Sequence, residues 1–214
     1  MTIPVSTPAP EARIAGTIQS LLRNEFLAFF VPEAREAKQM VLDVIREGMR
    51  VGLGGSQTLR QMGLPAALKG KGAVLLDHWD ESLSLEETLE VRHRQLDCDL
   101  FLSSVNAVTE QGELVSRDGV GNRIGATTFG PKKVMLLVGV QKIVPDLAAA
   151  FQRIREIAAP LRARSMNLGL PCTRAEGCVD CRDPARICRA TLILHRRPLL
   201  TDITVVLIGE SLGA

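Results

Sequence analysis

A glycine turn near residue 55 is the first stretch of this chain whose residues suit the binding of a ligand. The turn follows Val51 and Leu53, which alternate with glycines like the end of a buried strand. It precedes residues 57–62, whose composition suits a helix with Ser56 as its N-cap. Such a turn aims backbone N–H groups and the positive end of a helix dipole at one spot, where an anion can bind. The expected ligand-binding residues are Gly54, Gly55, Ser56, Gln57 and Thr58. The alternative is a tight corner between a strand and a helix that binds nothing.

A second polar cluster, at residues 103–123, follows the apolar run that ends at Leu102. Its glutamate could act as a base or a nucleophile, and its last arginine could form paired hydrogen bonds with a substrate carboxylate or phosphate. The expected catalytic residues are Glu110, Asn106 and Arg123, and the expected ligand-binding residues are Asp118 and Asn122. The alternative is that 110–112 and 118–119 form ordinary turns, in which polar side chains cap backbone groups.

Four cysteines with the spacing C-x5-C-x2-C-x6-C occupy a loop at residues 171–189. Thiolates are soft ligands, so four of them in one loop suit tetrahedral Zn²⁺ or a [4Fe–4S] cluster. The predicted metal ligands are Cys172, Cys178, Cys181 and Cys188. The spacing does not decide between iron and zinc, and four reduced thiols or a reversible disulfide are the alternatives. The fifth cysteine, Cys98, stands alone before an apolar run and is expected in the core.

Composition and missing motifs exclude several classes of function. The 26 basic and 24 acidic residues give a net charge of +2, which offers no footprint for nucleic acid. No apolar run reaches the roughly 18 residues of a membrane span. The dinucleotide-binding glycine pattern and the lysine of a triphosphate-binding loop are both missing. Residues 1–10 lack the pattern of a secretory signal and read as a flexible, proline-rich lead-in, so the expected location is the cytoplasm, which disfavours structural disulfides.

The elements that must position these residues alternate between helices and strands. Helical patterns cover 11–22, 34–47, 84–95, 119–129 and 145–157, the last followed by Pro160, which interrupts or restarts the helix. Ser84, with Glu87 three residues later, predicts a capping box at the start of the third helix. Strand patterns cover 26–31, 51–53, 73–77, 99–106, 114–115, 133–139, 190–195 and 203–208, although 26–31 could instead continue the first helix. The strands at 26–31 and 51–53 with the helix between them are predicted to form a β-α-β unit, and the strand at 73–77 is expected to be buried. This alternation predicts an α/β fold over residues 11–214, with an open, mostly parallel sheet and flanking helices. Ligands bind such sheets beyond the carboxyl ends of the strands, where the glycine turn and the second polar cluster both fall.

Four motifs taken together carry a resemblance to a known family. In order they are Val-Gly-Leu-Gly-Gly-Ser-Gln-Thr-Leu at 51–59, Ser-Val-Asn-Ala-Val-Thr-Glu-Gln-Gly-Glu-Leu at 104–114, Asp-Gly-Val-Gly-Asn-Arg at 118–123 and Phe-Gly-Pro-Lys-Lys-Val at 129–134. Over residues 11–212 the chain resembles the LUD domain, the lactate-utilisation family related to LutC and YkgG. The resemblance implies the isomerase and CoA-transferase-like α/β fold shared with ribose-5-phosphate isomerase. It also implies a ligand pocket where the glycine turn meets the 106–110 and 118–123 loops.

The same resemblance implies a role in oxidising lactate to pyruvate beside iron–sulfur partner subunits, with a small anionic metabolite as ligand. It does not require the four cysteines, which are a separate prediction. The leading hypothesis is a redox-complex subunit whose cysteine-ligated cluster relays electrons. One alternative is an isomerase or acyl-transfer enzyme with Glu110 as base or nucleophile. Another is a non-catalytic ligand-binding or assembly subunit that contains structural zinc.

Overall fold

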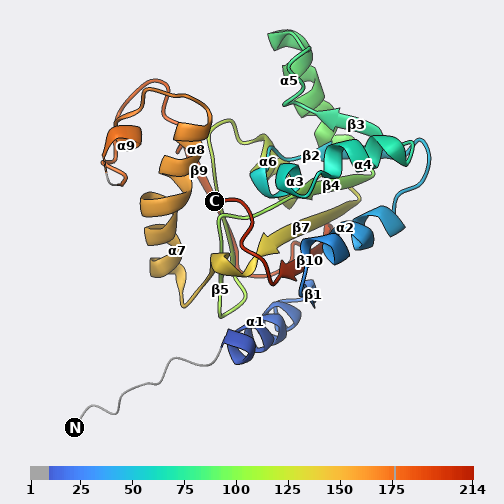
Figure 1. The fold of residues 1–214 in the computed structure, drawn as a ribbon, viewed down its shortest axis with the longest axis horizontal. Helices are drawn as coiled ribbons and strands as arrows, with labels where there is room; N and C mark the ends of the chain where they lie inside the picture. The colour runs from blue at the N-terminus through green and yellow to red at the C-terminus, as the bar shows by residue number, and fades with distance from the viewer. Residues whose placement is uncertain (1–9, 176) are drawn as a thin grey trace.

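Six parallel strands form the larger of two sheets in the computed structural model, which describes residues 10–175 and 177–214 (Figure 1). Their order across the sheet is β1-β10-β7-β4-β2-β3. The strands are β1 (Leu27–Val31), β2 (Arg50–Leu53), β3 (Val74–Asp77), β4 (Leu100–Ser103), β7 (Lys133–Gly139) and β10 (Asp202–Ile208). The middle strands are almost continuously apolar because other elements cover both of their faces. This confirms the predicted α/β fold with an open, mostly parallel sheet.

Three helices cover one face of the larger sheet. They are α2 (Ala34–Asp43), α3 (Gln57–Gln61) and α4 (Leu64–Gly70). Their buried side chains, among them Val41, Leu59 and Leu68, pack in one core with Leu102 and Leu137 of the sheet. The apolar stripe of each helix therefore faces the strands, as its sequence periodicity predicts.

A second sheet of four short strands covers much of the other face. Its order is β8-β5-β6-β9, with β6 antiparallel to both β5 and β9. The strands are β5 (Ala107–Thr109), β6 (Leu114–Asp118), β8 (Ile143–Val144) and β9 (Ala190–Leu194). Val108 and Leu114 of this sheet share a core with Phe101 and Leu136 of the larger one, and α1 (Pro10–Arg23) and α6 (Asn122–Thr128) close the same core. The sequence analysis did not predict this separate sheet.

A nearly continuous helical segment packs on the outer side of the second sheet (Figure 1). It consists of α7 (Leu147–Arg153), the π-helical turn η3 (Ile154–Ala158) and α8 (Ala159–Ser165), followed by the short α9 (Pro171–Arg174). Pro160 lies in the first turn of α8 and does not interrupt the segment. The π turn before it changes the hydrogen-bond register, which accommodates a residue that has no N–H to donate.

The helix α5 (Leu85–Arg94) begins at the predicted capping box. The N–H of Glu87 donates to Ser84 Oγ at 3.2 Å, and the N–H of Ser84 donates to Glu87 Oε2 at 2.8 Å. The helix continues into a 3₁₀ turn, η1 (Gln95–Asp97). This arrangement places the last turn of α5 and the start of η1 beside the ends of β2 and β3.

Several boundaries and pairings differ from the sequence predictions. The second helix ends at Asp43 rather than at 47, because residues 44–49 form turns that include Gly48 at φ +73°. The strand that follows it does not lie beside β1, since β1 pairs only with β10 while β2 lies between β3 and β4. The strand at 73–77 lies at the edge of the sheet and is half-exposed rather than buried.

Three further expectations concern the lead-in at residues 1–10, the extent of the first helix and a possible membrane span. Of the predicted flexible lead-in at residues 1–10, only Pro10 lies within the described residues, and it begins α1. The alternative that the first helix runs on through 26–31 is wrong, because α1 ends at Arg23 and β1 follows. None of the helices formed by the described residues is long and apolar enough to cross a membrane.

Candidate functional site

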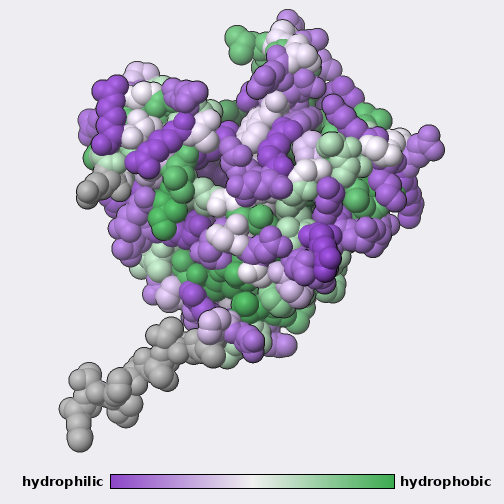
Figure 2. Space-filling view, viewed as in Figure 1, coloured by the Kyte–Doolittle hydropathy of each residue, from purple (hydrophilic) through white to green (hydrophobic). Residues whose placement is uncertain are grey.

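The carboxyl ends of β2, β3 and β4 open onto a cavity of about 200 Å³. Its walls come from the loops after these strands, from α6, from the 3₁₀ turn η2 (Val140–Lys142) and from η3 and α8. Figure 2 shows a hollow between the part of the molecule that carries α8 and α9 and the part that carries α5, with mostly hydrophilic residues around it. Ligands bind open α/β sheets at this end of the strands.

Both polar regions singled out in the sequence contribute to this cavity. The predicted residues that line it are Gly54, Gly55, Ser56, Gln57, Thr58, Asn106, Asp118, Asn122 and Arg123. The strand ends bring them together although the most distant members, Gly54 and Arg123, are 69 positions apart in the sequence. Of the predicted catalytic residues, Glu110 does not line the cavity, and of the predicted metal ligands only Cys188 does.

The glycine turn needs both of its glycines. A Cβ on Gly54 would lie 2.5 Å from Ser103 Oγ, so a side chain there would collide with β4. Gly55 has a φ of +61°, and a Cβ on it would lie 3.0 Å from both His78 Nε2 and Trp79 Nε1. Ser56 occupies the predicted N-cap position, but its side chain makes no capping hydrogen bond. The turn thus brings the backbone after β2 directly against the two aromatic side chains that follow β3.

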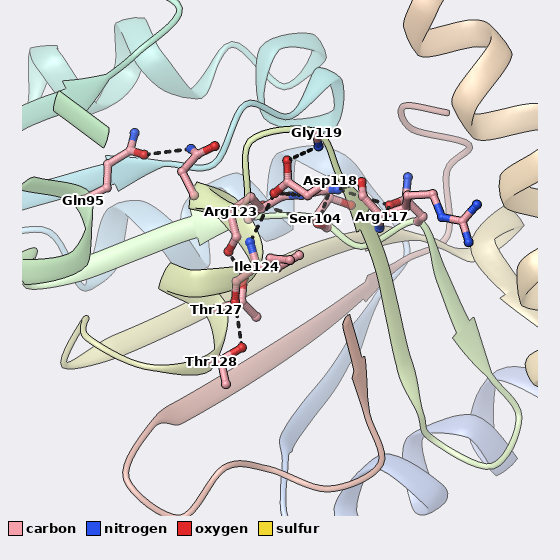
Figure 3. Close-up of polar contacts among 12 residues, drawn as sticks. Gln95, Ser104, Arg117, Asp118, Gly119, Arg123, Ile124, Thr127 and Thr128 are labelled. Atoms are coloured by element: carbon pink, nitrogen blue, oxygen red, sulfur yellow. Dashed lines mark hydrogen bonds and ion pairs between the residues drawn. The ribbon is translucent and has the colours of Figure 1, made fainter. Parts of the chain in front are cut away.

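Arg123 is the centre of a hydrogen-bond network that fixes the loop after β6 (Figure 3). Its Nη2 donates to Asn106 Oδ1 at 3.2 Å and to the carbonyl of Arg117 at 2.5 Å, and its Nε lies 3.8 Å from Asp118 Oδ2. The same carboxylate accepts the N–H of Gly119 at 2.8 Å. Burial lowers the pKa of Arg123, and the charge of Asp118 opposes that shift. Since protein acceptors occupy much of this guanidinium, Arg123 shapes the cavity more than it offers free donors to a ligand.

Gln95 is a buried residue that the sequence analysis missed, although it joins three walls of the cavity. Its Nε2 donates to the carbonyls of Leu53 and Leu76, at 2.9 and 2.8 Å, and so ties the ends of β2 and β3 together. Its Oε1 accepts a hydrogen bond from Asn122 Nδ2 at 3.3 Å (Figure 3). Its Nε2 also lies 3.0 Å from Nδ1 of His78, whose pKa burial lowers to about 4, so this imidazole is neutral at pH 7.

Lys142, which the sequence analysis also missed, places a buried amine in the cavity wall. Its Nζ donates to Thr58 Oγ1 at 3.2 Å and to Ser104 Oγ at 3.1 Å. Burial lowers the pKa of Lys142 to about 7, and the positive charges of Arg153 and Arg123 act in the same direction. The signal available in the sequence was the position of this lysine shortly after the apolar strand at 133–139. Residues there lie at the ligand-binding end of the sheet.

Positive charge dominates the cavity. Arg92, Arg117 and Arg162 also line it, and Asp118 is the only aspartate or glutamate among the described lining residues. The guanidinium of Arg162 stacks over the indole of Trp79, 4.2 Å from the ring centroid. The Nε of Arg92 is buried and has no hydrogen-bond partner among the described residues. The excess of positive charge suits an anionic ligand.

Glu110 lies away from this cavity, in the turn after β5. Its carboxylate pairs with Arg13 of α1, with Nε 2.6 Å from Oε1, and Arg13 also donates to the carbonyl of Ile143 at 2.8 Å. The contact fastens α1 to the second sheet. A catalytic role for Glu110 stays a prediction, and a ligand in the cavity would not be in reach of a residue that does not line it.

The four cysteines of the 171–189 loop are free thiols. Cys172 is buried against Ala163 and Leu170, and the neighbouring thiols Cys181 and Cys178 add to burial in raising its pKa. Among residues 10–175 and 177–214, no three His, Cys, Asp or Glu side chains are grouped as a metal ion would require. The donors suit iron or zinc by their chemistry but do not converge on one point, so the metal site stays a prediction. The core position expected for Cys98 is confirmed.

Comparisons with known proteins give matches that extend over nearly the whole chain. The LUD domain matches residues 14–208. A solved structure of a DUF162 family protein from Deinococcus radiodurans is similar with a TM-score of 0.54 at 14% sequence identity, covering 95% of this chain and 100% of that one. Two further structures, eIF2B beta and eIF2B delta from Chaetomium thermophilum, are 14% identical with TM-scores of 0.38 and 0.37. They cover 53% and 70% of this chain and 43% and 61% of their own. No curated protein matches the sequence.

The LUD match begins in α1 and ends at the last residue of β10, so it includes every strand that lines or supports the cavity. The similarity to the Deinococcus radiodurans protein extends over nearly the full length of both chains and agrees with a shared fold. The chain belongs to the LUD domain family.

Proposed function

We propose that this chain takes part in the oxidation of lactate or a related organic acid, as a subunit of a redox complex, and binds the acid in the cavity. Membership of the lactate-utilisation family supports the type of metabolite. The excess of positive charge in the cavity supports an anionic ligand, and the volume of about 200 Å³ suits a small one.

The observation that carries this proposal is an arginine in the cavity wall whose Nε has no hydrogen-bond acceptor among the described residues. Arg92 lines the cavity, and its buried Nε makes no hydrogen bond to a described group. A buried N–H without an acceptor costs about 1–3 kcal/mol, and more when the group is charged. A ligand carboxylate would remove that cost and would also be attracted by Lys142 and Arg162.

The cavity wall also contains groups that suit the carbon skeleton of a small acid. Val105 and Ile154 contribute apolar surface, and Trp79 contributes an indole on which Arg162 stacks. A short carboxylate can therefore place its charged end against cationic side chains and its carbon atoms against apolar ones. The apolar groups exclude water from those carbon atoms, which strengthens the electrostatic interactions with the carboxylate.

Titration calorimetry with lactate, pyruvate and the neutral amide lactamide tests this proposal. We expect both acids to bind, with an affinity that falls as salt is added, and lactamide to bind at least tenfold more weakly. Binding of lactamide as tight as that of lactate would contradict an anion site. Failure of every small 2-hydroxy and 2-oxo acid to bind would contradict the proposed ligand class.

The electron-relay part of the proposal depends on the cysteine loop. Cys172, Cys178, Cys181 and Cys188 would hold a [4Fe–4S] cluster, which when bound accepts and donates single electrons to iron–sulfur partner subunits. Arg186 supports the loop by donating to the carbonyls of Cys181 and Cys188 at 2.7 and 2.9 Å. Its charge would also offset the negative charge of four thiolates.

Anaerobic purification followed by a visible spectrum and by iron, sulfide and zinc analysis tests the relay. We expect a brown protein that contains iron and sulfide, loss of both in Cys181→Ser, and retention of both in Cys98→Ala, which removes a thiol outside the loop. A colourless protein without iron contradicts the relay. One zinc ion in its place would favour the alternative of a ligand-binding or assembly subunit with structural zinc.

A further inference from the structure

The amine of Lys142 is buried in the cavity wall and forms no ion pair with a carboxylate among the described residues. It is 2% exposed, and its hydrogen bonds go to the hydroxyls of Thr58 and Ser104. A hydroxyl can accept a hydrogen bond from an ammonium group or donate one to the lone pair of a neutral amine. The surroundings of Lys142 therefore accommodate both protonation states, unlike a carboxylate, which would hold the amine in its charged form.

The charged groups that act on this amine are both cations. Arg153 of α7 is held by the carbonyl of Asn106, to which its Nη1 donates at 2.7 Å, and Arg123 of α6 is held by the network around Asp118. Neither guanidinium can swing away to relieve the repulsion, because each is anchored to the backbone or to a carboxylate. With a pKa of about 7, about half of the Lys142 side chains are neutral at pH 7, against roughly one in several thousand for an ordinary lysine.

We propose that Lys142 forms a reversible imine with the carbonyl carbon of a 2-oxo acid bound in the cavity. The inference rests on the proposed function, since a 2-oxo acid is the product of oxidising a 2-hydroxy acid. A neutral, buried lysine that lines a ligand cavity has the properties of imine-forming lysines in general. Arg92, on the cavity wall supplied by α5, would bind the carboxylate of the same acid and so hold its carbonyl carbon in the cavity.

The step exchanges bonds without any oxidant or reductant. The lone pair of Nζ attacks the carbonyl carbon, and the carbonyl π electrons move to oxygen. One amine proton passes to that oxygen, and the hydroxyls of Ser104 and Thr58, 3.1 and 3.2 Å from Nζ, can relay it. The resulting carbinolamine loses its hydroxyl together with the second amine proton as one water molecule. Amine and ketone thus become imine and water, and hydrolysis restores both.

Trapping with borohydride tests the inference. The full chain is incubated with pyruvate or 2-oxobutyrate, reduced with sodium borohydride, and examined by intact mass and by peptide mapping. We expect one covalent adduct per chain, located on Lys142, and none with lactate, which carries a hydroxyl in place of the ketone. The adduct should disappear in Lys142→Arg, which keeps a positive charge but cannot form the imine, and persist in Lys133→Arg, which changes an exposed lysine of the same strand and turn region.

The pH dependence of the trapping rate tests the same inference on the wild-type protein. The initial rate of trapping should rise through pH 7 and level off above it, because only the neutral amine attacks. With an ordinary lysine, the rate would continue to rise up to about pH 10. Binding of pyruvate by calorimetry without any adduct on Lys142 would overturn the imine and leave the proposed function intact. Neither binding nor adduct with either acid would overturn both.

Discussion

Lys142 Nζ lies 3.2 Å from Thr58 Oγ1, so the turn that follows β7 is hydrogen-bonded to the helix that follows the glycine turn. The partners are 84 positions apart in the sequence, and both line the cavity. The expected glutamate does not line it, so Lys142 rather than Glu110 is a cavity-lining group whose pKa lies near 7.

The charge of Lys142 should make the stability of the fold depend on pH. Its pKa in the folded state is about 7, below that of an unfolded lysine, so the unfolded chain binds more protons between about pH 7 and pH 10. Folding stability from this residue therefore rises with pH in that window, by up to about 1.4 kcal/mol per pH unit. Urea unfolding at pH 7, 8 and 9 should show this rise in the wild type and a flatter profile in Lys142→Met. Parallel profiles for the two proteins would contradict the assigned environment.

Arg92→Gln should weaken the binding of lactate and pyruvate by tenfold or more, because it removes a cationic group of the cavity wall whose Nε has no acceptor among the described residues. Titration calorimetry measures the change. Arg94→Gln is the matched control, since it removes an exposed arginine from the last turn of the same helix, and it should alter affinity less than twofold. Equal losses in both variants would mean that the effect comes from overall charge rather than from the cavity.

Gly55→Ala should disrupt the site, since the new Cβ would occupy a backbone conformation at φ +61° and press on His78 and Trp79. We expect loss of ligand binding together with a destabilisation of about 1–3 kcal/mol. Gly16→Ala, in the exposed middle of α1 with nothing within 4 Å of its Cβ, should instead stabilise the protein by up to about 1 kcal/mol. Thermal unfolding combined with calorimetry separates the two effects. Unchanged affinity in Gly55→Ala would show that the turn does not contact the ligand.

Gln95→Leu should be among the most destabilising polar substitutions, at roughly 2–4 kcal/mol, because the carbonyls of Leu53 and Leu76 would lose their side-chain donor inside the protein. Chemical denaturation measures the loss. Gln39→Leu, which changes an exposed glutamine on α2, should stay within about 0.5 kcal/mol of the wild type. A small effect at Gln95 would show that water can replace its amide.

Glu110→Gln separates the isomerase or acyl-transfer hypothesis from the proposal that the chain binds an organic acid in the cavity. The isomerase or acyl-transfer hypothesis requires that the variant lose turnover of a verified substrate. If Glu110 serves instead to hold Arg13, the variant should bind lactate with unchanged affinity and lose about 1 kcal/mol of stability, the value of a partly exposed ion pair. Arg13→Gln should then lose at least as much stability, because it also removes the hydrogen bond to the carbonyl of Ile143. Loss of turnover in Glu110→Gln but not in Arg13→Gln would restore the catalytic role.

Much of the fold was predictable because long apolar strands and capped helices leave strong local patterns. The strand at 133–139 and the capping box at Ser84 appear in the structure as predicted. The second sheet was not predictable, because β5 and β8 contain only three and two residues, too few for any periodicity. The pairing of β1 with β10, at opposite ends of the sequence, likewise depends on the assembled sheet and on nothing local.

The cavity was predictable where polar residues directly follow a strand, as Asn106 and the glycine turn do. It was not predictable where a side chain enters from a helix. Arg92 lies in an Arg-His-Arg run that has the composition of a solvated helix face, yet the packing of α5 against the sheet buries its Nε. Gln95 ends a charged helix and gives no signal in sequence that its amide is the buried link between two strands.

The stacking of Arg162 on Trp79 has a practical consequence. The chain contains one tryptophan and no tyrosine, so nearly all of its near-ultraviolet fluorescence comes from a single indole in the cavity wall. A carboxylate that draws Arg162 off the ring, or that excludes water from it, should change the intensity and wavelength of that emission. The protein therefore carries its own optical reporter, and metabolites can be screened by intrinsic fluorescence without a label or a known reaction.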